Sequence, residues 1–239
     1  MQSNDQQAYD RGHTIFSPDG RLYQVEYARE AVKRGSPTVG VRTADAVVLA
    51  TDRRRRSRLI EPDSIEKLHD IDGRIGMGTA GHVADGRRLV DAGRTYAQRD
   101  RLRYGERPGV EPVAKAIADH IQESTQSGGT RPFGASLLVA GGSGDRPRLF
   151  EVEPSGTPYE WRATAIGAGS GEIRESLEER YERGLDTQRG VDLALRALAG
   201  QTDPTATTVD IAILGSDGFD QFDHDRRERA IESAGVTGS

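Results

Sequence analysis

The chain has 239 residues, with 38 acidic residues against 33 lysines and arginines, so its formal net charge is −5. This balance argues against a nucleic-acid-binding protein, and the absence of cysteine excludes disulfides, iron–sulfur clusters and thiol catalysis. No apolar run reaches the roughly 20 residues that span a bilayer, and the N-terminus lacks the pattern of a signal peptide. We therefore expect a cytoplasmic protein. Its acidic, lysine-poor composition is typical of a high-salt cytoplasm, and its lysines are only Lys33, Lys67 and Lys115.

The first part of the chain predicts a tail, a turn and a helix. Residues 1–12 are polar and lack periodicity, so we expect a mobile tail. Ser17-Pro18-Asp19-Gly20 is a turn signal. Apolar residues then recur at three- and four-residue spacing and predict a helix over 21–34, which Gly35 can end.

The rest of the chain predicts strands in groups, separated by pairs of helices. Because the strands are not each followed by a helix, the pattern favours two packed sheets with helices outside, in the α+β class. We find no linker and interpret residues 1–239 as one domain, with a C-terminal helix and tail over 223–239. The predicted strands cover 38–43, 46–51, 74–79, 133–140, 148–152, 159–166, 209–214 and 219–222. The predicted helices cover 82–103, 110–126, 171–183, 187–199 and 225–234.

Residues 9–28 form a long and specific motif, YDRGHTIFSPDGRLYQVEYA. This motif strongly resembles the N-terminal signature of 20S proteasome α-type subunits of the archaeal or closely related bacterial kind, and the composition favours a haloarchaeal one. Only residues 1–8 and those beyond about 222 lie outside the resemblance. Further matching motifs are Ser64-Ile65-Glu66-Lys67, Ala80-Gly81-His82-Val83-Ala84-Asp85, Arg131-Pro132-Phe133-Gly134, Arg148-Leu149-Phe150 and Ala165-Ile166-Gly167.

The resemblance implies a fold, a function and partners. The fold would be the four-layer αββα sandwich of the N-terminal-nucleophile hydrolases. The function would be structural and gating: an outer heptameric ring that controls substrate entry and docks a regulatory ATPase in ubiquitin-independent protein degradation. The implied partners are other α-subunits, proteasome β-subunits and an ATPase with a C-terminal docking motif. We predict no cofactor, metal, nucleic acid or membrane partner.

The resemblance also implies three functional regions: a gate, an activator-binding pocket and a pore annulus. In the activator-binding pocket, Lys67 would pair with the C-terminal carboxylate of the ATPase. At the pore annulus, many relatives carry tyrosine where this chain has Ser127, which puts the usual aromatic lining in doubt. The gate residues would be Tyr9, Asp10, Pro18 and Tyr27; the activator-binding residues Lys67, Gly35, Leu22 and His82; and the pore annulus Ser127, Gly128, Gly129 and Thr130.

We predict that the chain itself is not catalytic. The β-subunits use an N-terminal threonine whose free amine acts as the base, whereas about 35 residues precede the corresponding Ser36, so its nitrogen is an amide. Asp52, Arg54 and Lys67 match supporting charged residues of β-subunits, and we interpret them as inherited framework. Two alternatives remain: an N-terminal-nucleophile peptidase, and a divergent α-paralogue in mixed rings.

Two further motifs have simpler interpretations. The basic run Arg53 to Arg56 precedes several acidic residues, so we interpret it as a solvated face or as inter-subunit ion pairs. The segment 167–171 is glycine-rich but lacks the lysine and spacing of a phosphate-binding loop, so we interpret it as a strand-to-helix turn that Ser170 could cap.

Overall fold

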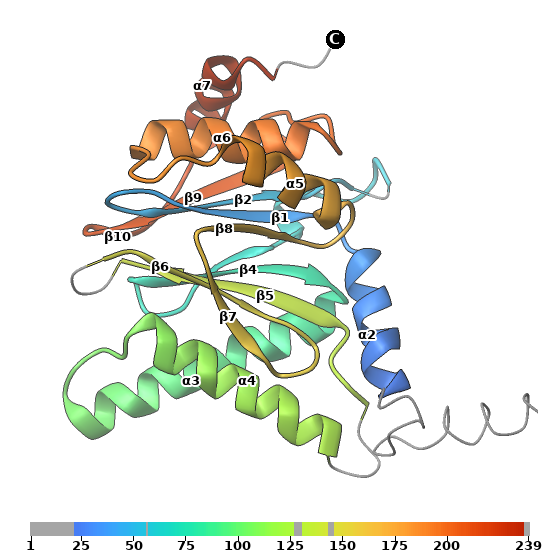
Figure 1. The fold of residues 1–239 in the computed structure, drawn as a ribbon, viewed down its shortest axis with the longest axis vertical. Coiled ribbons are helices and arrows are strands. Elements are labelled where there is room, and N and C mark those ends of the chain that lie inside the picture. Colours follow the sequence, from blue (N-terminus) through green and yellow to red (C-terminus); the bar gives the residue numbers. More distant parts are fainter. Residues whose placement is uncertain (1–21, 56, 127–130, 143–145, 237–239) are drawn as a thin grey trace, which may run out of the picture.

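Two five-stranded antiparallel sheets face each other between two layers of helices (Figure 1). This computed structural model describes residues 22–236 apart from 56, 127–130 and 143–145. The first sheet pairs strands that are distant in sequence, whereas the strands of the second sheet lie side by side in chain order. The predicted four-layer αββα sandwich of the α+β class is confirmed.

The first sheet has the strand order β10-β9-β2-β1-β8. Helices α5 (Ser170–Arg180) and α6 (Thr187–Ala199) cover its outer face, and α7 (His224–Ala234) packs on α6. Apolar side chains of β1, β2 and β9 form one core with these helices. The strands are β1 (Thr38–Arg42), β2 (Val47–Asp52), β8 (Ala163–Ile166), β9 (Val209–Gly215) and β10 (Gly218–Gln221).

The second sheet has the strand order β3-β4-β5-β6-β7. Helices α3 (Val83–Tyr104) and α4 (Val110–Gln126) cover its outer face and enclose a second core. A third core, which includes Leu49, Leu138 and Leu149, fills the space between the sheets. The strands are β3 (Leu68–Asp70), β4 (Ile75–Gly81), β5 (Ala135–Gly141), β6 (Arg148–Val152) and β7 (Pro158–Trp161).

Helix α2 (Tyr23–Lys33) stands across one end of the sandwich (Figure 1). Its apolar residues Val25, Ala28 and Val32 are buried at the predicted helical spacing. The helix ends where Gly35 passes Gly81 of β4 so closely that a Cβ on Gly35 would lie 2.2 Å from the Gly81 nitrogen. Glycine at position 35 is therefore a packing requirement as well as a helix stop.

The predicted strand over 159–166 is wrong as a single element. The chain crosses from one sheet to the other at Arg162: Trp161 pairs with Leu149 in the second sheet, and Ala163 pairs with Val41 in the first. No local signal marks this crossing, because both halves are β-rich and only their different partners separate them. Sequence reasoning also missed β3 and a 3₁₀ turn, Pro62–Ser64. The predicted cap at Ser170 is shifted, since the residue before α5 is Gly169, with φ +64°.

Candidate functional site

The side chain of Lys67 lies at the centre of a buried polar cluster where β1, β2 and β3 meet. Its Nζ donates to the Ser36 carbonyl (2.8 Å), the Ser36 hydroxyl (2.9 Å), the Pro37 carbonyl (3.1 Å) and the Asp52 carbonyl (2.9 Å). Burial lowers the pKa of Lys67 to about 7, although the carboxylates of Asp52 and Asp210 act in the opposite direction. Lys67 thus ties the chain that leads into β1 to the end of β2.

The Ser36 hydroxyl lies within hydrogen-bond distance of Lys67, an arrangement that resembles a serine nucleophile next to a lysine base. The same hydroxyl, however, also donates a hydrogen bond to a backbone carbonyl. Its Oγ donates to the Asp52 carbonyl at 2.7 Å while it accepts from Lys67. The Asp52 carboxylate accepts from the backbone and side-chain nitrogens of Arg54, at 3.1 and 3.0 Å. The geometry supports a clamp between strands, and the backbone nitrogen of Ser36 is an amide without basic character.

A hollow of about 390 Å³ opens beside this cluster, between α2 and the end of β4. Its outer wall is one face of α2, because residues at positions 27, 30, 31 and 34 follow helical spacing. Gly35 and Gly81, which lie in close contact, also line it, as does His82, whose side chain is half-exposed. The lining residues are Tyr27, Glu30, Ala31, Arg34, Gly35, Gly81 and His82.

Buried Asp85, in the first turn of α3, lies next to this hollow, and its backbone nitrogen donates to the carbonyl of His82, which lines the hollow. Its carboxylate accepts from both terminal nitrogens of Arg131, at 2.6 and 2.8 Å, and from the Gly134 backbone nitrogen at 2.9 Å. Burial raises the pKa of Asp85, but these hydrogen bonds outweigh burial and leave the pKa below its usual value. The imidazole Nδ1 of His82 lies 3.7 Å from the same carboxylate. Asp85 therefore joins His82 to the segment that leads into β5.

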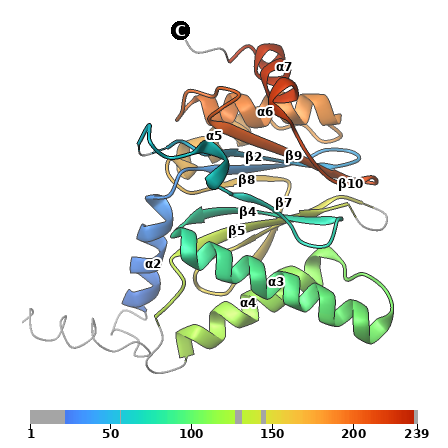
Figure 2. The ribbon, with the colours of Figure 1, turned by 180° about the vertical axis from the view of Figure 1, so that it is seen from behind.

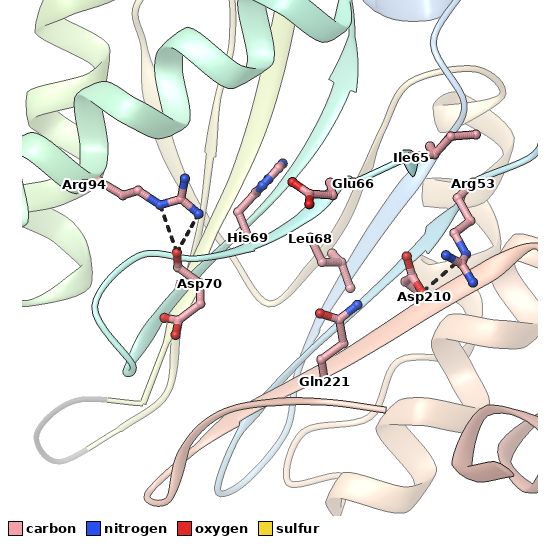
Figure 3. Close-up of a pocket in the computed structure, with 9 residues that line it drawn as sticks. All are labelled: Arg53, Ile65, Glu66, Leu68, His69, Asp70, Arg94, Asp210 and Gln221. Carbon is pink, nitrogen blue, oxygen red and sulfur yellow. Dashed lines mark hydrogen bonds and ion pairs between the residues drawn. The ribbon is translucent and has the colours of Figure 1, made fainter. Parts of the chain in front are cut away.

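A second cavity, of about 330 Å³, opens between the edge strands β3 and β10 (Figure 3). Its walls are mostly polar. The Arg53 Nε lies 3.4 Å from the Asp210 carboxylate, and Arg94 donates to the Asp70 carbonyl at 3.1 and 3.0 Å. His69 is buried in its wall, where burial lowers the imidazole pKa.

The structure brings some of the predicted site residues together and separates others. Gly35 and His82 line the hollow beside α2, and so does Tyr27, which the resemblance assigned to the gate. Lys67 lies behind that hollow, bonded to the two residues after Gly35. Leu22 precedes the opposite, N-terminal end of α2. The predicted residues Tyr9, Asp10, Pro18, Ser127, Gly128, Gly129 and Thr130 lie outside the described residues.

Sequence reasoning missed Ala31, Arg34 and Asp85 as neighbours of the site. The i, i+3, i+4 spacing of positions 27, 30, 31 and 34 could have indicated one shared helix face. The basic run is more than a solvated face, since Arg53 is buried with Asp210 and Arg54 binds Asp52. Among the residues that the structure describes, no cluster of three His, Cys, Asp or Glu side chains could hold a metal ion.

Comparison with known proteins decides the family. The family model for the proteasome subunit matches residues 32–214, and the model for the N-terminal signature of the A type of these subunits matches residues 9–31. The chain belongs to the proteasome subunit family and is an α-type member. The expected sandwich is accordingly of the N-terminal-nucleophile hydrolase type.

The α-type assignment agrees with curated relatives from haloarchaea, which confirms the predicted kind of proteasome subunit. The chain is 57% identical over 236 residues to the proteasome alpha 2 subunit of Haloarcula marismortui, covering 97% of each chain. It is 60% identical over 195 residues to the proteasome alpha subunit of Halobacterium salinarum, covering 82% of this chain and 77% of the relative. It is 53% identical to the proteasome alpha 1 subunit of Haloferax volcanii, covering 95% and 92%. Within the described part of this proteasome subunit, no helix is both long enough and apolar enough to cross a membrane.

Proposed function

We propose that this α-type subunit forms the outer heptameric ring of a 20S proteasome, restricts substrate entry and docks a regulatory ATPase, without cleaving peptides itself. The observation that carries the proposal is the A-type signature at residues 9–31, which continues through α2 into β1 in one chain. A peptidase of this fold needs a free amine at the start of the first strand. In this protein the segment that carries the signature precedes the first strand, so the residues at the start of that strand have no free amine.

The hollow beside α2 supports docking of a C-terminal peptide from the ATPase. Its lining offers apolar surface from Tyr27 and Ala31 and two groups that can attract a carboxylate, Arg34 and His82. The lining also includes Glu30, which would disfavour an acidic segment on that side. This combination fits a peptide that ends in an apolar residue and a free carboxylate.

In this proposal Lys67 receives the terminal carboxylate only by an exchange of partners. An ammonium group has three hydrogens, and Lys67 already has four oxygen acceptors within the chain. An incoming carboxylate would therefore replace one of the contacts to Ser36 or Pro37. Such an exchange would shift the segment after Gly35 and so transmit docking to the end of α2.

The gate and the pore annulus complete the proposed function. Tyr9, Asp10 and Pro18 would form a cluster with Tyr27 that holds the N-terminal tails away from the pore. Residues 127–130 would line the annulus through which unfolded chains pass. Tyr27 supplies a link, because it also lines the hollow in which the ATPase peptide would bind.

The test compares ATPase-stimulated with unstimulated degradation of a protein substrate by assembled complexes. Arg34→Glu should abolish the stimulation because it places a negative charge where the peptide carboxylate approaches. Lys67→Ala should abolish it as well. Arg34 is exposed, so its variant separates docking from folding, whereas Lys67→Ala also leaves buried carbonyls without a donor.

Arg180→Glu is the matched control, since Arg180 is also exposed and lies at the end of α5. It should leave both rates unchanged. If the ATPase still stimulates degradation fully in the Arg34→Glu complex, the docking proposal is wrong. Peptide cleavage by the purified chain alone, together with loss of residues 1–35 on N-terminal sequencing, would instead favour the peptidase alternative.

A specific observation keeps the mixed-ring alternative open. Two relatives of this chain come from Haloarcula marismortui, the proteasome subunits alpha 1 and alpha 2. The chain is 54% identical to the first and 57% identical to the second. The family resemblance also marks His13 and Pro37, like Ser127, as departures from the usual pattern, and these departures would fit a paralogue. Co-purification of a second α-type chain with a tagged copy would support mixed rings, and a ring of this chain alone would count against an obligate mixture.

A further inference from the structure

The charge of the hollow beside α2 depends on pH through one of its lining residues, His82. The ionisable groups of the lining include a carboxylate, Glu30, a guanidinium, Arg34, and the imidazole of His82. Carboxylates and guanidinium groups ordinarily keep their charge between pH 5 and 8, whereas histidine is the residue type that gains or loses a proton in this range. The charges of Glu30 and Arg34 cancel, so a proton on His82 leaves the hollow with one positive charge.

The backbone of His82 is fixed, while its side chain remains accessible. Its backbone nitrogen donates to the Gly134 carbonyl at 2.8 Å, and its carbonyl accepts from the backbone nitrogens of Asp85 and Gly86 at 3.1 and 3.0 Å. The side chain is 58% exposed. His82 directly precedes α3, which begins beside α2 in Figure 2. A substitution of the imidazole therefore changes the wall of the hollow without removing a backbone contact.

The carboxylate of Asp85 lies close to His82 without cancelling the charge of a protonated imidazole. It is 3.7 Å from the imidazole Nδ1, but it is already paired with the guanidinium of Arg131, and it accepts from the Gly134 nitrogen as well. The other ring nitrogen, Nε2, has no hydrogen-bond partner among the residues that the structure describes. A protonated His82 can therefore donate from Nε2 to a ligand in the hollow.

The other charged groups near His82 lie on α2 and behind the hollow. Glu30 and Arg34 belong to the α2 wall, and Glu30 pairs with Lys33 at 2.7 Å. Lys67 lies behind the hollow, where its Nζ donates to backbone carbonyls and burial lowers its pKa to about 7. Both His82 and Lys67 could thus make binding depend on pH, but only His82 lines the hollow.

Resting on the proposed docking function, we infer that protonation of His82 strengthens the binding of a peptide with a free C-terminal carboxylate in the hollow. The charged imidazole would act together with Arg34 on the incoming carboxylate. Because a bound carboxylate and a bound proton favour each other, the affinity should rise as pH falls from 8 to 5.5. The gain should be about threefold, as expected for one half-exposed ion pair.

Binding of a fluorescent peptide to assembled complexes of this chain with β-subunits tests the inference by anisotropy at constant high salt. The peptide ends in leucine with a free carboxylate, which stays ionised at both pH values. Wild-type complexes should bind it about threefold more tightly at pH 5.5 than at pH 8. The same peptide with a C-terminal amide should bind with equal affinity at both pH values, because it has no terminal charge.

Two variants of His82 separate the charge of the side chain from its shape. His82→Gln should bind the free-acid peptide at both pH values as the wild type does at pH 8. His82→Lys should bind it at pH 8 as tightly as the wild type does at pH 5.5, because its positive charge is present at both pH values. His224→Gln is the matched control, since His224 is an exposed histidine at the start of α7, and it should keep the wild-type pH dependence.

The outcomes separate this inference from the proposed function. Equal wild-type affinities at the two pH values overturn the inference but leave the docking proposal. A pH dependence that persists in His82→Gln also overturns it and assigns the titration to Lys67. Loss of binding by His82→Gln at both pH values overturns it as well, since His82 would then supply more than a proton. If wild-type complexes bind the free-acid peptide at neither pH, the docking function itself is wrong.

Discussion

Arg131 holds Asp85 through two parallel hydrogen bonds, with Nη1 2.6 Å from Oδ2 and Nη2 2.8 Å from Oδ1. The pair joins the first turn of α3 to the chain just before β5, and it supports His82 at the edge of the hollow. Arg131 directly follows residues 127–130, to which the resemblance assigned the annulus. The pair thus links the two regions for which we propose functions.

We predict that Asp85→Ala lowers the free energy of unfolding by about 2 kcal/mol, because the buried Gly134 nitrogen loses its acceptor. The exposed side of the Arg131 pair adds little, since solvent screens it. Asp85→Asn should cost less, as its amide oxygen can still accept from Gly134. Urea denaturation checks both values. Equal losses in the two variants would contradict the role given to the Gly134 contact.

Gly35→Ala should lower the free energy of unfolding by about 2 kcal/mol through overpacking. The added Cβ would lie 2.2 Å from the Gly81 nitrogen and 2.7 Å from its Cα, and backbone atoms cannot rotate away. Gly171→Ala is the control, because nothing lies within 4 Å of its Cβ and alanine favours the helix. Denaturation midpoints that shift equally in both variants would contradict this view of α2 docking.

We predict that the protein loses stability in acid as the carboxylate of Glu111 becomes protonated. Hydrogen bonds from Lys115 and then Arg148 lower its pKa from 4.5 to about 2. A carboxylate with a lowered pKa stabilises the fold above its ordinary pKa, and this contribution fades as pH falls from 4.5 toward 2. The melting temperature of Glu111→Gln should therefore lie below that of the wild type at pH 6, and the difference should disappear near pH 2.

The control for this pH dependence is Glu178→Gln, whose carboxylate has no ion pair among the residues that the structure describes. Its melting temperature should follow that of the wild type at each pH. A difference between Glu111→Gln and wild type that persists unchanged into acid would mean that the carboxylate acts through packing and not through charge.

Most long elements of this protein could be predicted from the sequence, because helical spacing and β-rich runs are local signals. The helices over 187–199 and 110–126 match their predicted bounds, and the signature at the N-terminus indicated the family without any structure. The sequence also singled out Lys67 as a residue with a special role. What it could not provide was the surroundings of that lysine.

By itself, then, the sequence of this protein determined the family, the α+β class and most of the helices and strands. The tertiary structure decided that Lys67 is buried among carbonyls of Ser36, Pro37 and Asp52, and that the run over 159–166 divides between two sheets. It also decided that Tyr27 and His82 line one hollow. The physical reason is that strand partners, burial and pocket walls depend on residues far apart in the chain, which no local pattern encodes.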